Sequence, residues 1–190
     1  MTIIKTDKEL NKRHENDFYQ TPYTVAIMMC NRFISPMKTI GIGCGSGIFG
    51  KAYEAIHKTK IDGIDIIDRG VKEIYNNFYL ADCNNFDYSS YDLVIGNPPY
   101  YCVTKFVIDL LQIDKVDNLI LLLPLSFLET SKRQREVYSK KFLREIFVMG
   151  RVSFYDSGKT DNTAYGVYHF TSKPNESSKV NFDFSKSKWF

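Results

Sequence analysis

The sequence predicts an α/β fold, in which a doubly wound, mostly parallel sheet carries helices on both faces. Segments with a strand-like apolar pattern alternate with segments of helical period through most of the chain, as they do in βαβ units. Leu119–Leu123 is an unbroken apolar run, which is typical of a strand that is covered on both faces. The 190 residues, of which 44% are hydrophobic, suit a single domain with a substantial core.

Composition and charge limit the partners and the cellular compartment that we expect for the protein. The formal net charge of +3 permits a nucleic-acid partner without requiring one. No apolar run approaches the roughly 20 residues that span a membrane, so we expect no membrane partner. The cysteines and histidines lack metal-ligand spacing and are scattered at Cys30, Cys44, Cys83 and Cys102 and at His14, His57 and His169. We therefore expect no metal site and, without a secretory leader, reduced thiols in a cytoplasmic protein.

The N-terminal part divides into an arm and a helix. Residues 1–16 are polar and charged without a clear period, and we expect them to form an arm. Thr21 can then act as the N-cap of a helix, and Pro22 suits its first helical position. The helix is predicted over Pro22–Phe33, with an apolar face that covers the sheet.

A glycine-rich turn follows the first predicted strand, Met37–Ile42. Gly43, Gly45 and Gly47 allow a sharp turn and let a ligand approach the backbone. A helix is predicted over Ile48–His57, and its first N–H groups would point at the same place. The order of strand, glycine turn and helix indicates a site for a nucleotide-type cofactor. A dinucleotide oxidoreductase is the alternative, but it needs a third glycine at wider spacing.

The second predicted strand, Lys60–Ile66, ends in acidic residues. Asp65 stands 22 positions after Gly43, close to the spacing at which an acid binds the ribose hydroxyls of a nucleotide. A carboxylate can accept a hydrogen bond from each of the two hydroxyls. Asp68 is a rival for this role, but we interpret it as the N-cap of a helix over Arg69–Asn76.

The stretch with the most specific chemistry is Asn97-Pro98-Pro99-Tyr100, which follows a buried strand predicted over Tyr91–Gly96. The prolines have no N–H and a fixed φ, so their carbonyls are rigid and free to accept hydrogen bonds. Asn97 adds a side-chain carbonyl, and Tyr100 adds a flat ring. Together these groups can bind a planar group that carries an NH2. The alternative is a proline-rich turn that ends a strand and places a tyrosine in the core.

The rest of the chain continues the alternation of strands and helices. We predict a third strand and its exit at Tyr79–Asn84, helices at Val103–Gln112 and Thr130–Lys141, strands at Arg144–Val152 and Ala164–Phe170, and an edge strand at Val180–Phe184. The second of these helices carries five basic residues: Lys132, Arg133, Arg135, Lys140 and Lys141. We interpret them as a solvated helix face, with phosphate contact by some of them as the alternative. The polar loop 153–162 is of a kind that carries function.

Asn-Pro-Pro-Tyr after a strand, together with the glycine turn and Asp65, resembles the motifs of S-adenosylmethionine-dependent N6-adenine DNA methyltransferases. The resemblance covers residues 17–170 and implies the Rossmann-like class I methyltransferase fold, with seven strands of which the last is antiparallel and inserted near one edge. It implies transfer of a methyl group from S-adenosylmethionine to the exocyclic amine of a flipped-out adenine in DNA. Residues 17–190 would form a single catalytic domain without a separate target-recognition domain. Recognition would depend on loops, a partner subunit or a second copy of the chain.

The resemblance also implies roles for individual residues. Catalysis is expected from Asn97, Pro98, Pro99 and Tyr100. Cofactor contacts are expected from Thr21, Pro22, Gly43, Cys44, Gly45, Gly47, Asp65, Ile66, Asp82, Cys83 and Asn97. Substrate contacts are expected from Tyr100, Phe154, Arg133 and Arg135, with Tyr155 as a further candidate. One position departs from the family pattern, because Gly41 stands where an acid usually helps to anchor the cofactor.

Other functions stay open at this point. The same motif serves enzymes that methylate adenine in RNA or the glutamine amide of a protein, because that amide is also flat and weakly nucleophilic. The glutamine methyltransferases usually have an N-terminal helical domain, for which the 36 residues before the first predicted strand are too few. Gly41 in place of an acid keeps a non-catalytic cofactor-binding subunit open. For Asp82, the alternative to a cofactor contact is a loop cap.

Overall fold

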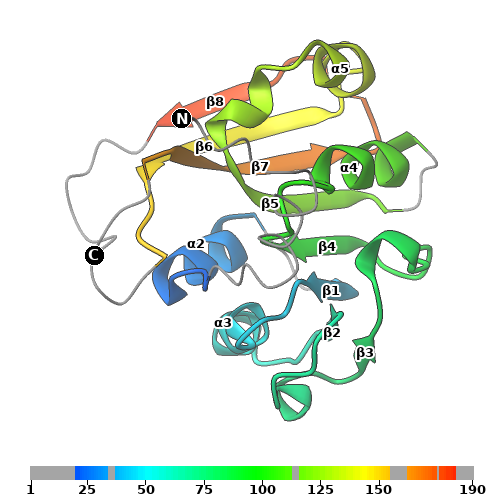
Figure 1. Cartoon of the computed structure of the whole chain (residues 1–190), viewed down its shortest axis with the longest axis vertical. Coiled ribbons are helices and arrows are strands. Elements are labelled where there is room, and N and C mark those ends of the chain that lie inside the picture. The colour runs from blue at the N-terminus through cyan, green and yellow to red at the C-terminus, as the bar shows by residue number, and fades with distance from the viewer. Residues whose placement is uncertain (1–19, 34–36, 113–115, 155–161, 175, 183–190) are drawn as a thin grey trace, which may run out of the picture.

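The centre of the fold is one eight-stranded sheet, seen in a computed structural model that describes residues 20–33, 37–112, 116–154, 162–174 and 176–182 (Figure 1). The strands are β1 Thr39–Ile42, β2 Asp62–Asp65, β3 Phe78–Leu80, β4 Leu93–Gly96, β5 Asn118–Pro124, β6 Leu143–Arg151, β7 Ala164–Thr171 and β8 Lys179–Phe182. Their order across the sheet is β3-β2-β1-β4-β5-β7-β6-β8. The predicted N-terminal arm, residues 1–16, lies outside the described residues.

The sheet is mostly parallel, as the sequence predicts. Strands β1 to β5 run parallel to one another, and β7 is inserted antiparallel between β5 and β6. The sheet has eight strands instead of the seven that the family resemblance implies, because the predicted edge strand near Val180 pairs in parallel with β6. The outermost strand at this edge is therefore an addition to the expected seven.

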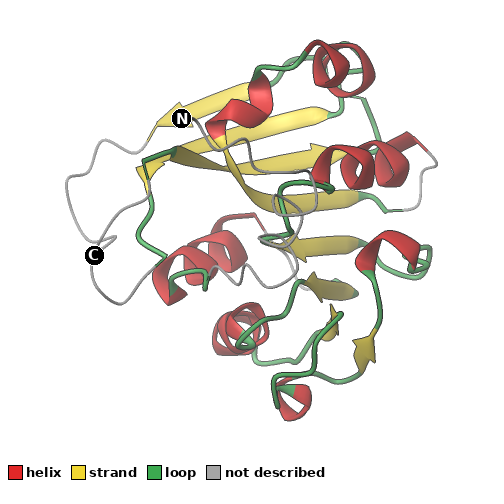
Figure 2. Cartoon of the chain, viewed as in Figure 1, coloured by secondary structure: helices red, strands yellow, loops and turns green. Residues whose placement is uncertain are grey.

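Helices cover both faces of the sheet, which confirms the predicted layers (Figure 2). The helices are α2 Tyr23–Phe33, α3 Ile48–His57, α4 Val103–Gln112 and α5 Ser131–Arg133. Helices α2 and α3 pack with one face of the central strands, through residues such as Met29 and Tyr53. Helix α4 packs with the opposite face, through residues such as Phe106 and Val107.

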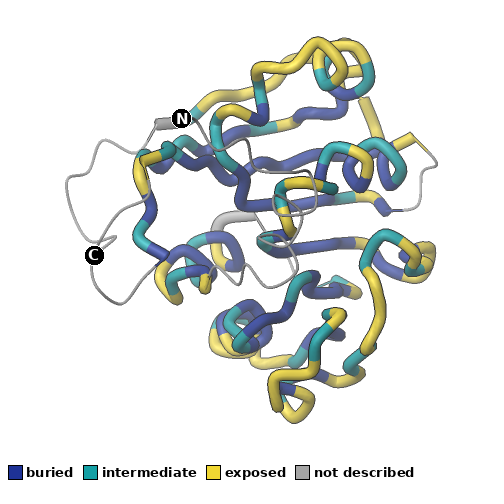
Figure 3. The backbone as a smooth tube through the Cα atoms, viewed as in Figure 1, coloured by how far each residue is buried: buried dark blue, intermediate teal, exposed yellow. Residues whose placement is uncertain are grey.

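The central strand β5 shows why its sequence is apolar throughout. Leu119, Leu121 and Leu123 pack in the core with α4, whereas Ile120 and Leu122 pack in the core with α2 and α3. All five side chains are fully buried. Each buried side chain of this size contributes about 1.5–3 kcal/mol of transfer free energy, so a polar residue on either face would be costly. Figure 3 shows the same burial along β4, β5 and β7.

The helix predicted over Arg69–Asn76 is not formed. In its place the structure has one 3-10 turn, η1 Lys72–Ile74. Gly70 has a φ of +75°, which lies outside the helical region. The carboxylate of Asp68 accepts a hydrogen bond from the Gly70 N–H and pairs with the Lys72 ammonium, so it stabilises a loop and not a helix start.

The predicted charged helix over Thr130–Lys141 is shorter and changes its winding. Thr130 caps α5, since its hydroxyl oxygen accepts from the Arg133 N–H at 3.4 Å. After α5 the chain continues as a π-helix, η4 Gln134–Tyr138. The wider turn leaves Val137 fully buried in the core with α4. Before α5, the 3-10 turn η3 Leu125–Leu128 connects it to β5.

The residues that the structure describes contain neither a membrane-spanning helix nor a cluster of metal ligands. None of the helices there is long and apolar enough to cross a membrane. The same residues contain no cluster of three His, Cys, Asp or Glu side chains that could hold a metal ion.

Candidate functional site

The glycine turn, Asp65 and Asn97 meet at the carboxyl edge of the parallel strands. In the register of the sheet, Ile42 is paired with Ile64 and with Gly96. The glycine turn, Asp65 and Asn97 come directly after these residues in their own strands. This register confirms the predicted convergence of segments that are distant in the chain. Open α/β sheets bind ligands at this edge.

The glycine turn needs its glycines for backbone geometry and for close packing. Gly43, Gly45 and Gly47 have positive φ values of 59°, 52° and 79°. A Cβ on Gly43 would lie 3.3 Å from the Asn97 carbonyl oxygen, and a Cβ on Gly47 would lie 2.3 Å from Ile74 Cδ1. The turn therefore packs directly against the chain at Asn97, and it leads into α3 with Gly47 as the N-cap.

Asp65 is held in a fixed orientation beside the glycine turn. Its Oδ2 accepts a hydrogen bond from the Gly45 N–H at 2.8 Å, and its Oδ1 accepts from the Ile67 N–H at 2.9 Å. The guanidinium of Arg69 lies 3.5 Å from Oδ2. Oδ1 has a further lone pair that could accept from a ligand hydroxyl, and a second hydroxyl could replace the long contact of Oδ2 with Arg69. The sequence analysis identified Asp65 but missed Arg69, four residues later.

The ring of Tyr75 lies beside three glycines below the turn, Gly41, Gly50 and Gly63. A Cβ on Gly41 would lie 3.4 Å from Ile61 Cδ1 and 3.8 Å from the Tyr75 ring. A Cβ on Gly50 or Gly63 would come within 2.8 or 2.7 Å of the same ring. Tyr75 is buried. Gly50 and Gly63 therefore make room for this ring, whereas a Cβ on Gly41 would make ordinary contacts with it.

Gly41→Asp is therefore expected to destabilise the protein without strengthening cofactor binding. A carboxylate that loses its water beside Ile61 and the Tyr75 ring should lower the free energy of unfolding by about 3 kcal/mol or more. Urea unfolding measures this change. Gly41→Ala is the control, because its Cβ would make ordinary contacts. A Gly41→Asp variant of normal stability and higher cofactor affinity would show that an acid fits here.

Asp82 acts as a cap in this structure. Its Oδ1 accepts from the N–H of Asn84 at 2.9 Å and from the Asn84 side chain at 2.8 Å, at the start of the 3-10 turn η2 Cys83–Asn85. The Asp82 side chain is exposed at the carboxyl end of β3, so its other oxygen faces outward. Burial raises the pKa of the Cys83 and Cys44 thiols to about 12, so both thiols are neutral.

The side-chain amide of Asn97 is bonded at both of its ends. Its Nδ2 donates to the Thr21 hydroxyl at 3.1 Å, and its Oδ1 accepts from the Tyr100 hydroxyl at 2.9 Å. Pro98 is buried, and no described residue donates a hydrogen bond to its carbonyl. The Pro99 carbonyl is already used, since it accepts from the N–H and the thiol of Cys102. The acceptors that remain for a ligand are the Pro98 carbonyl and the second lone pair of Asn97 Oδ1.

Thr21 does not cap α2, which corrects the prediction from the sequence. The helix begins at Tyr23, and the Pro22 carbonyl accepts its first hydrogen bonds, from Val25 and Ala26. The Thr21 hydroxyl is bonded to Asn97 instead, and the residue is 3% exposed. The segment before the first strand therefore reaches the Asn97–Tyr100 stretch through a side chain.

Three aromatic rings follow Asn97 along the edge of the sheet. Tyr100 is half-buried, and its ring centroid lies 6.1 Å from that of Tyr165 on β7. Phe154 packs edge-on against Tyr165, with centroids 4.9 Å apart, and is itself buried. Phe154 thus supports Tyr165, a residue that the sequence analysis did not single out. Tyr155 lies outside the described residues.

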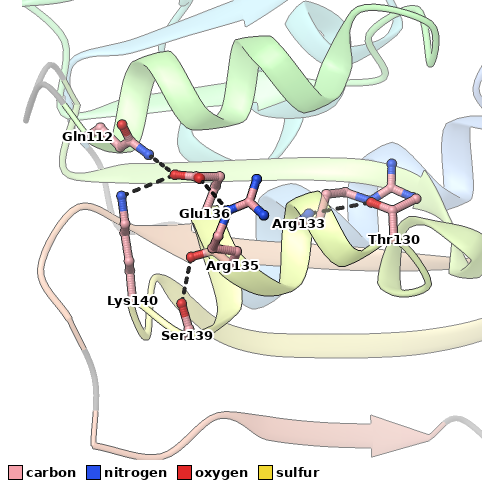
Figure 4. A network of polar contacts seen from close by, with 7 residues as sticks. All are labelled: Gln112, Thr130, Arg133, Arg135, Glu136, Ser139 and Lys140. Carbon is pink, nitrogen blue, oxygen red and sulfur yellow. Dashed lines mark hydrogen bonds and ion pairs between the residues drawn. The ribbon is translucent and has the colours of Figure 1, made fainter.

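Arg133 and Arg135 differ in their surroundings. The Arg133 guanidinium donates to Thr104 Oγ1 and to the Ser126 carbonyl, and it stacks on the Phe127 ring at 4.4 Å. Arg133 therefore links α4 to η3. Arg135 pairs with Glu136, which also accepts from Gln112 and Lys140 in a surface network (Figure 4). The Arg135 side chain is 71% exposed, which supports the interpretation of this run as a solvated face.

Exposed apolar side chains gather at the same edge of the sheet. The large apolar residues that are exposed in the described part of the chain are Tyr23, Ile66, Leu80, Tyr101 and Val180. All but Val180 lie at or beside the carboxyl ends of the parallel strands. Ile66 follows Asp65 directly and is 58% exposed.

The fold is shared with solved structures of methyltransferases, although no protein-family model and no curated protein matches the sequence. A dimethyladenosine transferase from Plasmodium falciparum has a TM-score of 0.58 at 17% identity, over 81% of this chain and 62% of its own. A Pyrococcus horikoshii protein described as an RNA methyltransferase has a TM-score of 0.60 at 15% identity, over 92% of this chain and 100% of its own. A Listeria monocytogenes protein described as a class I S-adenosylmethionine-dependent methyltransferase has a TM-score of 0.56 at 11% identity, over 90% of this chain and 68% of its own. The chain has the Rossmann-like class I methyltransferase fold, and it spans less than two thirds of the Plasmodium enzyme.

Proposed function

We propose that this protein transfers a methyl group from S-adenosylmethionine to the exocyclic amine of adenine in DNA. The observation that carries the proposal is the contact between two motifs at the carboxyl edge of the sheet. The glycine turn packs against the Asn97 carbonyl, so a cofactor on the turn would lie next to the acceptors of Asn97 and Pro98. A methyl donor and an NH2 acceptor would thus share one site.

The residues present suit S-adenosylmethionine. The turn at Gly43 and Gly45 has no Cβ atoms to obstruct a ligand, and α3 directs its first N–H groups toward it. The Asp65 carboxylate can accept from the ribose hydroxyls while it keeps its bonds to Gly45 and Ile67. Ile66 offers an apolar surface for the adenine ring of the cofactor. When bound, the cofactor supplies an electrophilic methyl on a sulfonium, and the sulfide leaves after transfer.

The chemistry of the target explains the need for rigid acceptors. The lone pair of an exocyclic adenine amine is delocalised into the ring, which makes the amine a poor nucleophile. Acceptance of its two hydrogens by Asn97 Oδ1 and the Pro98 carbonyl would favour a tetrahedral nitrogen whose lone pair is free. The main contribution of the protein is then alignment in a partly buried setting. A base in a duplex must be flipped out to reach this edge, and Tyr100 can stack on it.

Adenine in RNA is the second candidate for the substrate. It is favoured by the likeness to the Pyrococcus horikoshii protein described as an RNA methyltransferase. The acceptor geometry is the same for both substrates, since it concerns the base and not the sugar. Target selection would come from loops around the edge, from a partner subunit or from a second copy of the chain. A glutamine amide and a non-catalytic role remain as outcomes of the test.

Incubation with S-adenosylmethionine that carries a deuterated methyl group tests the substrate. Four substrates are offered in parallel: single-stranded DNA, duplex DNA, RNA and a glutamine-containing peptide. The products are digested and analysed by mass spectrometry. We expect the label on adenine in DNA. Label on RNA alone would move the substrate to RNA, and label on the peptide would move it to protein. Cofactor binding without label on any polymer would support the non-catalytic role.

A further inference from the structure

We propose that the hydroxyls of Thr21 and Tyr100 clamp the Asn97 amide from both ends, and that Thr21 is a positioning residue for the transfer. The inference rests on the proposed function, in which Asn97 Oδ1 accepts from the target amine. It gives Thr21 a role different from the cofactor contact that the family resemblance implies.

The two contacts hold opposite ends of one amide group. The nitrogen end of Asn97 donates to Thr21 at 3.1 Å, and the oxygen end accepts from Tyr100 at 2.9 Å. Thr21 lies 76 residues before Asn97 in the chain, whereas Tyr100 follows three residues after it. The clamp therefore joins the segment before α2 to the end of β4.

Thr21 is itself held firmly. It is 3% exposed, and α2 begins two residues after it, at Tyr23. Val25, Ala26 and Met29 of α2 are fully buried against the sheet. The Thr21 hydroxyl thus has a rigid support and can fix the amide to which it is bonded.

The chemistry of the reaction needs one orientation of this amide. Oδ1 has two lone pairs, of which Tyr100 uses one and leaves the other for the target amine. If the amide rotated by half a turn, its NH2 would face the NH2 of the target, and two donors would oppose each other. In the structure the nitrogen end is bonded to Thr21, and the oxygen end lies toward Tyr100 and the target. A hydroxyl can donate as well as accept, so the role of Thr21 is to hold the amide in its plane and position.

Thr21→Val tests the clamp, because valine keeps the shape of threonine and loses the acceptor. We expect kcat to fall about 10- to 100-fold through misalignment of Asn97. The dissociation constant of the cofactor should stay within about twofold, since the fold and the glycine turn are unchanged. Thr21→Ser retains the hydroxyl and should restore kcat to within about threefold of wild type. Thr171→Val is the matched control, because Thr171 is also buried but lies at the far end of β7.

A second measurement tests the contact between Thr21 and Asn97 without depending on catalysis. The side-chain NH2 of Asn97 gives its own pair of signals in a ¹⁵N NMR spectrum, and its hydrogen exchange should speed up at least tenfold in Thr21→Val. Unchanged exchange together with unchanged kcat would overturn the proposal, as would weaker cofactor binding at normal kcat. If wild type transfers no methyl group, the proposed function fails, and the exchange rate alone still decides whether the clamp exists.

Discussion

Asn97→Ala is expected to reduce methyl transfer by about 10³-fold or more, comparable to the loss of a preorganised group that contacts the reacting atoms in other enzymes. The substitution removes the Oδ1 acceptor and with it both contacts of the clamp, to Thr21 and to Tyr100. The target amine would then keep its delocalised lone pair and lose its alignment with the methyl group. The affinity for S-adenosylmethionine should stay within about threefold, because the glycine turn and Asp65 are untouched.

The control for this prediction is Asn76→Ala. Asn76 is exposed, and its side chain donates only to the Lys60 carbonyl in the described part of the chain. Single-turnover transfer of labelled methyl groups separates the chemical step from binding. Transfer by Asn97→Ala at the wild-type rate would show that the amide oxygen has no part in the reaction.

Asp65→Ala is expected to weaken S-adenosylmethionine binding by about 100-fold, from the loss of two charge-assisted hydrogen bonds to the ribose. It also removes the acceptor of the Gly45 and Ile67 N–H groups, so the glycine turn loses the hydrogen bond that holds Gly45. At saturating cofactor the transfer rate should fall much less than in Asn97→Ala. Asp65→Ala should therefore lower mainly the affinity for the cofactor, whereas Asn97→Ala should lower mainly the rate of transfer.

Calorimetric titration of the cofactor measures the Asp65→Ala effect, and Asp68→Ala is its control. Asp68 lies in the same loop and also accepts from a backbone N–H, that of Gly70, but it is paired with Lys72 at the surface. We expect Asp68→Ala to bind the cofactor as wild type does. Equal losses in both variants would mean that the loop as a whole, and not the Asp65 carboxylate, determines affinity.

The fold could be predicted because local patterns and layer packing agree in most segments. Helices α3 and α4 have the predicted bounds, Ile48–His57 and Val103–Gln112. The continuous apolar run of β5 correctly indicated a strand covered on both faces. One failed prediction is the helix over Arg69–Asn76, where Gly70 takes a positive φ and the buried residues Val71 and Tyr75 flank a 3-10 turn. A spacing of apolar residues over so few positions does not distinguish the two conformations.

The residues that end strands were predictable, whereas the contacts between distant side chains were not. Asp65 and Asn97 could be identified because parallel strands bring their carboxyl ends to one edge. The bond from Thr21 to Asn97 and the Tyr75 ring near Gly41 depend on how α2 and the η1 turn pack. Local sequence gives no signal for contacts between side chains that are distant in the chain. The position of Thr21 before a helix predicted an N-cap, and the structure has a bond to Asn97 instead.

The position of the transferred methyl group tests the central claim most directly. DNA with ¹⁵N at the exocyclic amine of adenine is incubated with the protein and with S-adenosylmethionine that carries a deuterated methyl group, and the nucleosides are fragmented by mass spectrometry. If Asn97 and Pro98 hold the amine against the donor, the deuterated methyl group will be found on the ¹⁵N-labelled nitrogen. A methyl group on a ring nitrogen, or none on DNA, RNA or peptide with the cofactor bound, would contradict this account.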